Sequence, residues 1–234
     1  LDRHGLLEKQ RRRQPWDHPG RLAVATTAPN DVWPADFKGQ FKTDDGQYCY
    51  PLTVTDHFSR RVLACRSLPT ITVADARAVF LVSFRAYGLP RAIRTDNGVP
   101  FAGPGLQGLS SLNIWWMQLG IAHQRIRPGC PQENGSHERM HRELKRETAR
   151  PPAATHRAQQ RRFDAFRRRY NAERPHEALD DRTPDSVWVP STRPYPKRRL
   201  TPEYPACLVK RRVSHGGTMG WGGRVGVLGE VLRG

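Results

Sequence analysis

Residues 32–68 read VWPADFKGQFKTDDGQYCYPLTVTDHFSRRVLACRSL, and this stretch decides the fold class. It holds three runs rich in β-branched and aromatic residues, namely VWPADF, YCYPLTVTDHF and RRVLACRSL. Polar turns separate the runs, and the segment Thr43-Asp44-Asp45-Gly46 has the Asp-Gly pair typical of a hairpin. The stretch therefore predicts an antiparallel meander of three strands. Because proline cannot donate to a sheet ladder, we expect Pro34 at the start of the first strand.

Downstream of residue 70 the hydrophobic period changes to that of a helix, which predicts a helix over 72–88 that ends at Gly88. The remaining pattern predicts a strand over 92–95, a helix over 109–119, a strand over 121–126, an irregular loop over 128–131, a helix from 133 to about 150 and a basic helix over 156–171. The order β-β-β-α-β-α-β-α predicts an α/β protein of the ribonuclease-H-like fold, with a mixed five-stranded sheet flanked by helices. Trp115 and Trp116 are expected to make core or dimer contacts.

The composition points to a polyanionic partner. The 234 residues carry a formal net charge of +17, with a pI of about 10.8 and a mean hydropathy of −0.72. Such a charge favours DNA or RNA over a membrane surface, and a merely basic or ribosomal protein is the alternative. No apolar run is long enough for a transmembrane helix, and the N-terminus lacks the apolar stretch of a signal peptide. The four cysteines are widely spaced, which is typical of a reduced cytosolic protein without a zinc knuckle or disulfide framework.

Composition also divides the chain into three parts. Residues 1–30 are basic and turn-rich, and we interpret them as a linker that could trail from a missing N-terminal DNA-binding domain. Residues 31–190 form the predicted α/β domain. Residues 191–234 are rich first in Pro and Arg and then in Gly, which indicates a flexible tail or a truncated small β module. The chain does not begin with Met, so we expect it to be a fragment.

Three carboxylates stand where this fold would bring them together. Asp36 lies in the first strand, Asp96 ends the fourth strand, and Glu138 lies on the helix that follows the 128–131 loop. Strand ends next to turns expose functional groups in α/β sheets, and clustered carboxylates are what a two-metal phosphodiester site needs. Asp56 competes with Asp36 for the first position. Glu133 and Glu143 compete with Glu138, while Asp44 and Asp45 are interpreted as turn residues.

Helical spacing predicts one polar stripe on the helix that carries Glu138. The stripe holds a carboxylate bordered by donors and cations, which fits a helix lying against DNA phosphates. Taken alone, it also fits a solvent-facing helix with ion pairs, and the histidine could be a simple surface residue. The residues that share this stripe are Asn134, Glu138, His141, Arg142 and Lys145.

The same residues carry a family resemblance. The segments Trp33–Gly39, Tyr50–Asp56, Ser59-Arg60, Arg94–Gly98, Asn134–Arg139 and Tyr170–Leu179, taken in order, resemble the retroviral-integrase-like catalytic core of insertion-sequence transposases. The resemblance runs over about residues 28–190. It implies a DDE triad of Asp36, Asp96 and Glu138 that binds two Mg²⁺ or Mn²⁺ ions, and it assigns Asp56 to a non-catalytic position. Asn97 and Gly98 are expected to shape the loop beside Asp96.

The resemblance also implies a reaction and its partners. Water would hydrolyse a phosphodiester at a transposon end, and the freed 3′-OH would then attack target DNA. The expected partner is double-stranded DNA, bound by a homo-oligomer in a bacterial cytoplasm at the nucleoid. In this family a helix-turn-helix module usually lies upstream, and residues 213–223 resemble the opening of a small β-barrel. Two alternatives stay open, an inactive remnant that binds DNA and regulates intact transposase, and a ribonuclease-H-type nuclease that cuts without joining.

The predicted DNA-contacting surface is the basic stretch 139–169. It holds eleven Lys or Arg residues against three acids, an imbalance that supplies phosphate affinity independent of sequence. A solvated basic face is the alternative. The residues predicted to contact DNA are Asn134, His141, Arg142, Lys145, Arg161, Arg162, Arg167 and Arg168.

Overall fold

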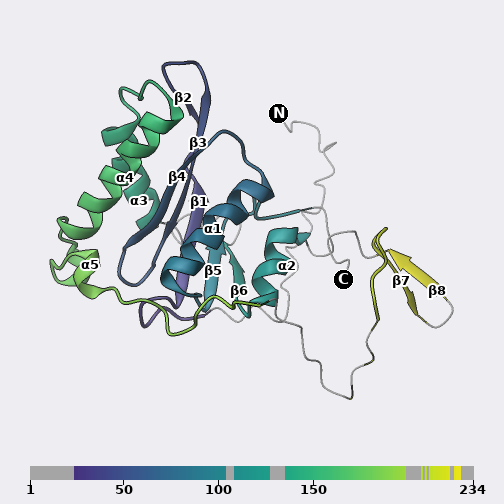
Figure 1. Cartoon of the computed structure of the whole chain (residues 1–234). Coiled ribbons are helices and arrows are strands. Elements are labelled where there is room, and N and C mark those ends of the chain that lie inside the picture. Colours follow the sequence, from purple (N-terminus) through teal and green to yellow (C-terminus); the bar gives the residue numbers. More distant parts are fainter. Residues whose placement is uncertain are drawn as a thin grey trace, which may run out of the picture.

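Strand β1 (Val32–Phe37) lies inside a mixed sheet that organises the whole domain (Figure 1). The computed structural model describes residues 24–103, 108–126 and 135–198, together with 207, 209, 211–221 and 224–227. The sheet follows the order β2-β3-β1-β5-β6, and β4 (Val62–Leu68) pairs with β3 (Tyr48–Thr55). Strands β5 (Ala92–Thr95) and β6 (Ala122–Arg125) run parallel to β1, whereas β3 runs antiparallel to it. The predicted mixed sheet of five strands is therefore confirmed, with β2 (Phe41–Lys42) as an additional two-residue strand.

The predicted meander forms, and its hairpin turn has the predicted position. Strand β2 pairs with the first residues of β3, and the Thr43 amide donates to the Gln47 carbonyl at 2.9 Å across the turn. Asp45 accepts a bond from the Thr43 hydroxyl, and Gly46 takes a φ of 81°, which favours glycine. Asp44 and Asp45 are thus turn residues.

The expected position of Pro34 is wrong, because Pro34 is the third residue of β1 and is buried. The strand changes partners at this point. It pairs with β5 from Val32 to Pro34 and with β3 from Ala35 to Phe37. Pro34 therefore stands where the β3 ladder has not yet begun, and its missing N–H removes no bond from that ladder.

One face of the sheet is apolar and is covered by helices α1 (Val73–Tyr87) and α2 (Ser111–Gln118). Trp33 in β1 and Leu52 and Val54 in β3 point to this face and are fully buried. Trp116 is also fully buried and meets Phe80 edge-on at a ring-centroid distance of 4.9 Å. The expectation of a core role for Trp115 and Trp116 is thereby confirmed.

The opposite face is covered by α3 (Gly135–Thr148) and α4 (His156–Ala172), which lie on the far side of the sheet from α1 and α2 (Figure 1). Met140 and Leu144 of α3 pack with Phe163 and Phe166 of α4 in a second apolar cluster. All four predicted helices form within one or two residues of the expected bounds. The predicted start of the third helix, at residue 133, falls in the segment 127–134, which lies outside the described part of the chain.

The end of α4 and the chain that follows it are tied back to the sheet and its connections. Asn171 accepts a bond from the Val62 amide at 2.8 Å and donates one to the Val62 carbonyl at 2.9 Å, so it ties the end of α4 to β4. A short 3₁₀ helix (Glu177–Leu179) and α5 (Pro184–Val187) follow. Beyond them, Arg193 donates to the carbonyls of Pro90 and Leu119. Near the C-terminus, β7 (Thr218–Trp221) and β8 (Arg224–Val227) form an antiparallel hairpin.

Among the described residues, Cys49, Cys65 and Cys207 are free, and no helix combines the length and apolar character needed to cross a membrane. Most of the predicted N-terminal linker and the 128–131 loop lie outside the described residues.

Candidate active site

The register of two parallel strands places Asp36 beside Asp96. Strands β1 and β5 pair in register at Val32 with Ala92 and at Pro34 with Arg94. Continuing that register by two residues sets Asp36 opposite Asp96, at the carboxyl ends of both strands. Because residues alternate between the two faces of a strand, Asp36 points away from the core face that holds Trp33 and Ala35. Asp36 thus lies on the face that α3 covers.

A tight turn shapes the surroundings of Asp96. The Gly98 amide donates to Asp96 Oδ1 at 3.1 Å, and Asn97 donates to the Ile126 carbonyl at 3.1 Å, which ties the turn to the end of β6. A Cβ atom at position 98 would lie 3.1 Å from Asp96 Oδ2. The absence of a side chain at Gly98 therefore leaves room for the carboxylate of Asp96.

Helix α3 brings Glu138 to the same region. Its buried side chains follow helical spacing toward the sheet, and Glu138 is exposed beside them. Those buried side chains belong to His137, Met140, His141, Leu144 and Thr148.

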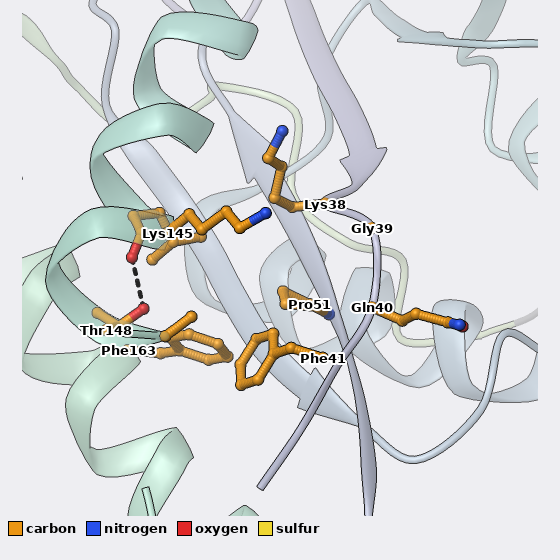
Figure 2. A pocket seen from close by; sticks show the side chains of 10 residues that line it. Lys38, Gly39, Gln40, Phe41, Pro51, Lys145, Thr148 and Phe163 are labelled. Carbon is orange, nitrogen blue, oxygen red and sulfur yellow. Dashed lines mark hydrogen bonds between the residues drawn. The ribbon is translucent and has the colours of Figure 1, made fainter. Parts of the chain in front are cut away.

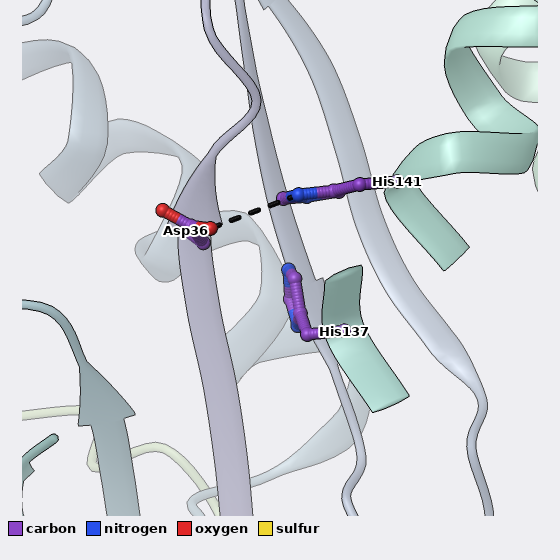
Figure 3. A group of neighbouring side chains, drawn as sticks. All are labelled: Asp36, His137 and His141. Carbon is purple, nitrogen blue, oxygen red and sulfur yellow. Dashed lines mark ion pairs between the residues drawn. The ribbon is translucent and has the colours of Figure 1, made fainter. Parts of the chain in front are cut away.

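A group of hydrogen bonds joins α3 to the sheet next to Asp36. Figure 3 shows the His137 and His141 side chains of α3 beside Asp36 of β1. The Thr53 hydroxyl lies 2.7 Å from His137 Nε2 and 2.6 Å from His141 Nε2. Thr53 pairs with Asp36 across the β1–β3 ladder. On its other side, His141 Nδ1 lies 3.7 Å from Asp36 Oδ2. Both imidazoles are only 1% exposed, and Thr55 adds a 3.1 Å contact to His137 Nδ1.

The ionisation of Asp36 is affected by both of the other carboxylates. Burial, followed by the charges of Asp96 and Glu138, raises the pKa of Asp36 to about 7. The Phe37 amide and the Lys38 charge act in the opposite direction. Burial, followed by the charges of His57 and Lys38, lowers the pKa of His137 to about 3, and burial also lowers the pKa of His141. The site therefore combines crowded carboxylates with neutral imidazoles near pH 7.

This donor set fits a hard divalent cation. Like-charged carboxylates that raise one another's pKa are stabilised by a cation between them, and Mg²⁺ takes oxygen ligands. A second grouping also exists, since Asp36, His137 and His141 each offer a ligand atom within 4.8 Å of the others. The two Nε2 atoms, however, converge on the Thr53 hydroxyl, which occupies the space between them. We therefore interpret the histidines as hydrogen-bonded residues and the carboxylates as the cation-binding groups.

The competing carboxylates are engaged elsewhere. Asp56 is fully buried and accepts bonds from the Asn30 amide at 2.6 Å, the Ser59 amide at 2.8 Å and the Ser59 hydroxyl at 2.6 Å. Glu143 forms an ion pair with Arg174 at 2.6 Å. Both therefore have structural partners away from Asp36. Glu133 lies outside the described residues.

Two lysines line a pocket at the β1–β2 connection, which follows Asp36 in the chain. Lys38 and Lys145 line the same pocket of about 100 Å³, whose inner wall includes Phe41, Leu144 and Phe163. Figure 2 shows the Lys145 side chain reaching across this pocket toward the segment that carries Lys38. Lys38 is two residues from Asp36, and Lys145 lies two helical turns after Glu138. The site is thus acidic at its centre and basic at this edge.

The residues predicted to contact DNA divide into three groups. Arg142, Lys145, Arg161, Arg162 and Arg168 are exposed on α3 and α4. His141 is buried against Thr53, so it cannot contact DNA. On the helical wheel it lies at the border between the buried and exposed faces of α3. Arg167 also drops out, since it donates to the Leu63 carbonyl at 3.2 Å and the Tyr87 hydroxyl at 3.0 Å and packs against the fold. Asn134 lies outside the described residues.

Sequence reasoning did not single out Thr53, Thr55 or His137. A signal was available, because two threonines alternate with Leu52 and Val54 in a strand that is otherwise buried. The histidines are four residues apart, which places them on one face of a helix.

The geometry can be compared with known proteins. Two sequence models, both of the integrase core domain, match residues 26–131 and 119–184. An insertion element IS476 protein of Xanthomonas euvesicatoria is 31% identical over 65% of this chain and 42% of its own length. An insertion element IS407 protein of Burkholderia multivorans is 29% identical over 87% of this chain and 69% of its own length.

A solved structure has the same fold. A chain of the simian T-cell lymphotropic virus intasome, in complex with the PP2A regulatory subunit B56 gamma, superposes with a TM-score of 0.58. It is 19% identical to this chain, and the match covers 79% of this chain and 62% of that one. Of the two insertion-element proteins, the chain spans less than half of the Xanthomonas protein and about two thirds of the Burkholderia protein.

Proposed function

This chain belongs to the integrase core domain family, in the lineage of insertion-element transposases, and from that premise we propose that it cuts and joins DNA strands at transposon ends. The observation that carries the proposal is the convergence of Asp36, Asp96 and Glu138 from two parallel strands and a helix. Asp96 and Glu138 both raise the pKa of Asp36, and a cation bound between the carboxylates would relieve their mutual repulsion.

Asp36, Asp96 and Glu138 would hold two Mg²⁺ or Mn²⁺ ions. Bound ions in such sites activate the attacking oxygen and stabilise the charge that develops on the phosphate. Asp36 binds a cation only after it loses its proton, and the Lys38 charge favours that loss. The Gly98 amide orients the carboxylate of Asp96, while the exposed Glu138 approaches from α3.

The two reactions differ only in the attacking oxygen. In the first, water attacks a phosphodiester at the transposon end, a P–O bond breaks, and a 3′-OH is released. In the second, that 3′-OH attacks a phosphodiester of target DNA, so one P–O bond forms as another breaks. No oxidant or nucleoside triphosphate is consumed. One set of carboxylates therefore serves both steps.

Exposed arginines and lysines of α3 and α4 would bind the DNA backbone. We assign phosphate contacts to Arg142, Lys145, Arg161, Arg162 and Arg168. Double-stranded DNA is then the substrate, and we propose that the protein works as a homo-oligomer on paired ends. Such a substrate places the protein with the bacterial chromosome in the cytoplasm.

The test uses the full chain, a pre-cut oligonucleotide with a free 3′-OH and a supercoiled target plasmid in Mg²⁺. We expect strand transfer by the wild type and a loss of at least about 100-fold in Asp96→Asn and Glu138→Gln, with DNA affinity unchanged within about threefold. Joining that survives both substitutions would contradict the proposal. Cutting without joining would favour a nuclease, and DNA binding without either reaction would favour a regulatory remnant.

A further inference from the structure

A buried polar cluster lies between α3 and the sheet, directly behind the carboxylates. This Thr53 cluster consists of Thr53, His137 and His141. Thr53 is fully buried, and each imidazole is 1% exposed. The rings meet edge-on, with centroids 4.4 Å apart. Buried polar groups of this kind are costly unless every donor and acceptor has a partner.

The hydrogen-bonding capacity of Thr53 is completely used. A hydroxyl has one proton and two lone pairs, and Thr53 Oγ1 has three partners. It donates to the main-chain carbonyl of Asp36 at 3.2 Å, so its lone pairs are left to accept from His137 Nε2 and His141 Nε2. On this basis we assign the proton of each imidazole to Nε2. The Thr55 hydroxyl donates to His137 Nδ1 at 3.1 Å, and His141 Nδ1 faces Asp36 Oδ2 at 3.7 Å, beyond hydrogen-bond distance.

This arrangement joins two of the carboxylate-bearing elements through one atom. His137 and His141 flank Glu138 on α3, at the preceding residue and three residues later. Thr53 contacts the backbone of Asp36 itself. Farther along α3, Met140 and Leu144 make apolar contacts, which are not directional, and Glu143 forms its ion pair with Arg174. The hydrogen bonds of Thr53 are directional and therefore fix both the rotation and the height of α3 at Glu138.

We propose that the Thr53 cluster is a positioning device that sets Glu138 against Asp36 for cation binding, an inference that rests on the proposed function. Thr53, His137 and His141 are positioning residues here and take no part in bond making. Loss of the Thr53 hydroxyl leaves two Nε2–H groups buried without an acceptor, so the first turns of α3 must shift to hydrate them. A displacement of about 1 Å is enough to spoil a shared cation site.

The first test compares the affinity of the metal-free protein for Mn²⁺, measured from the free-Mn²⁺ signal in electron paramagnetic resonance. We expect Thr53→Val to weaken Mn²⁺ binding at least tenfold and Thr53→Ser, which keeps the hydroxyl, to stay within threefold of wild type. The matched control is Thr148→Val. It also removes a buried threonine hydroxyl, in this case on α3, which donates to the Leu144 carbonyl at 2.6 Å far from Glu138. It should lower thermal stability without changing Mn²⁺ affinity.

Unchanged Mn²⁺ affinity in Thr53→Val, or an equal loss in Thr148→Val, would overturn the proposal. The second test needs neither a variant nor a cation. Long-range ¹H–¹⁵N spectra of the metal-free wild type should show His137 and His141 as neutral Nε2–H tautomers between pH 6 and 8. An Nδ1–H tautomer or a charged ring at either position would break the hydrogen-bond assignment. If Asp96→Asn binds Mn²⁺ as tightly as the wild type, the proposed function fails. The tautomers of His137 and His141 still test the hydrogen bonds of the Thr53 cluster independently.

Discussion

At the scale of single residues, the site depends on charges that the fold forces together. Asp36 has a pKa of about 7 because burial and the charge of Asp96 both disfavour its ionised form. In the unfolded chain its pKa is near the ordinary 3.8. Between these values the folded protein holds a proton that the unfolded chain has released. Raising the pH across this window therefore favours unfolding.

We expect the stability of the cation-free protein to fall between about pH 4 and pH 7 and then to level off. Each pKa unit corresponds to about 1.4 kcal/mol, so the contribution of Asp36 reaches a few kcal/mol at most. Asp36→Asn removes this titration, and the difference between the two proteins in urea unfolding, measured at each pH, isolates it from other groups. Added Mg²⁺ should stabilise the wild type more at pH 8 than at pH 5. Parallel curves for the two proteins would mean that the three carboxylates are not assembled.

At the scale of elements, local patterns predicted most of the fold. Strand β5 has the predicted bounds, and α1 ends at Gly88, where φ is 81°. Two features needed knowledge of the third dimension. Pro34 is tolerated inside β1 because the strand changes partners there, which no local rule predicts. Strand β2 is two residues long and exists only because it pairs with β3.

A family resemblance helped to predict Asp36, Asp96 and Glu138 as site residues. The sequence did not predict the buried hydrogen bonds that Thr53 makes beside them. His141 lies about 60° on the helical wheel from Glu138, so sequence alone could not decide whether it faced solvent or the sheet. Burial decided it, because Thr53 offers a partner on the sheet. Arg167 was misplaced for a similar reason, since its partners at Leu63 and Tyr87 are far away in sequence.

The Asn171 side chain joins α4 to β4. Asn171 satisfies both the N–H and the carbonyl of Val62 at the first residue of β4, and it is 3% exposed. Asn171→Ala leaves both backbone groups buried without partners, which should lower the free energy of unfolding by about 2–4 kcal/mol in urea titrations. The exposed Glu173 is the control, and Glu173→Ala should change stability by less than about 0.5 kcal/mol. Equal effects would show that Asn171 does not anchor α4.

At the scale of the whole molecule, charge is distributed unevenly between the two helical layers. Helices α3 and α4 expose many cations, among them Arg142, Lys145, Arg161 and Arg168, and α4 presents the last two on one face, seven residues apart. Helix α1 on the opposite side exposes Arg77 and Arg85. The net charge of +17 attracts DNA to either layer at low salt. Only local contacts can make one layer the binding face.

The double substitution Arg161→Ala and Arg168→Ala should therefore weaken binding to duplex DNA and lower the slope of log K against log salt by about 1.8, because each phosphate contact contributes about 0.9. Fluorescence anisotropy over a series of salt concentrations measures both quantities. The control is Arg77→Ala with Arg85→Ala, which removes the same charge from α1 and should leave the slope within about 0.5 of wild type. Arg167→Ala should instead lower stability, since its guanidinium supports Leu63 and Tyr87. Equal slopes for the two double variants would mean that net charge, and not the α3–α4 layer, holds the DNA, and the assignment of Arg161 and Arg168 would then be wrong.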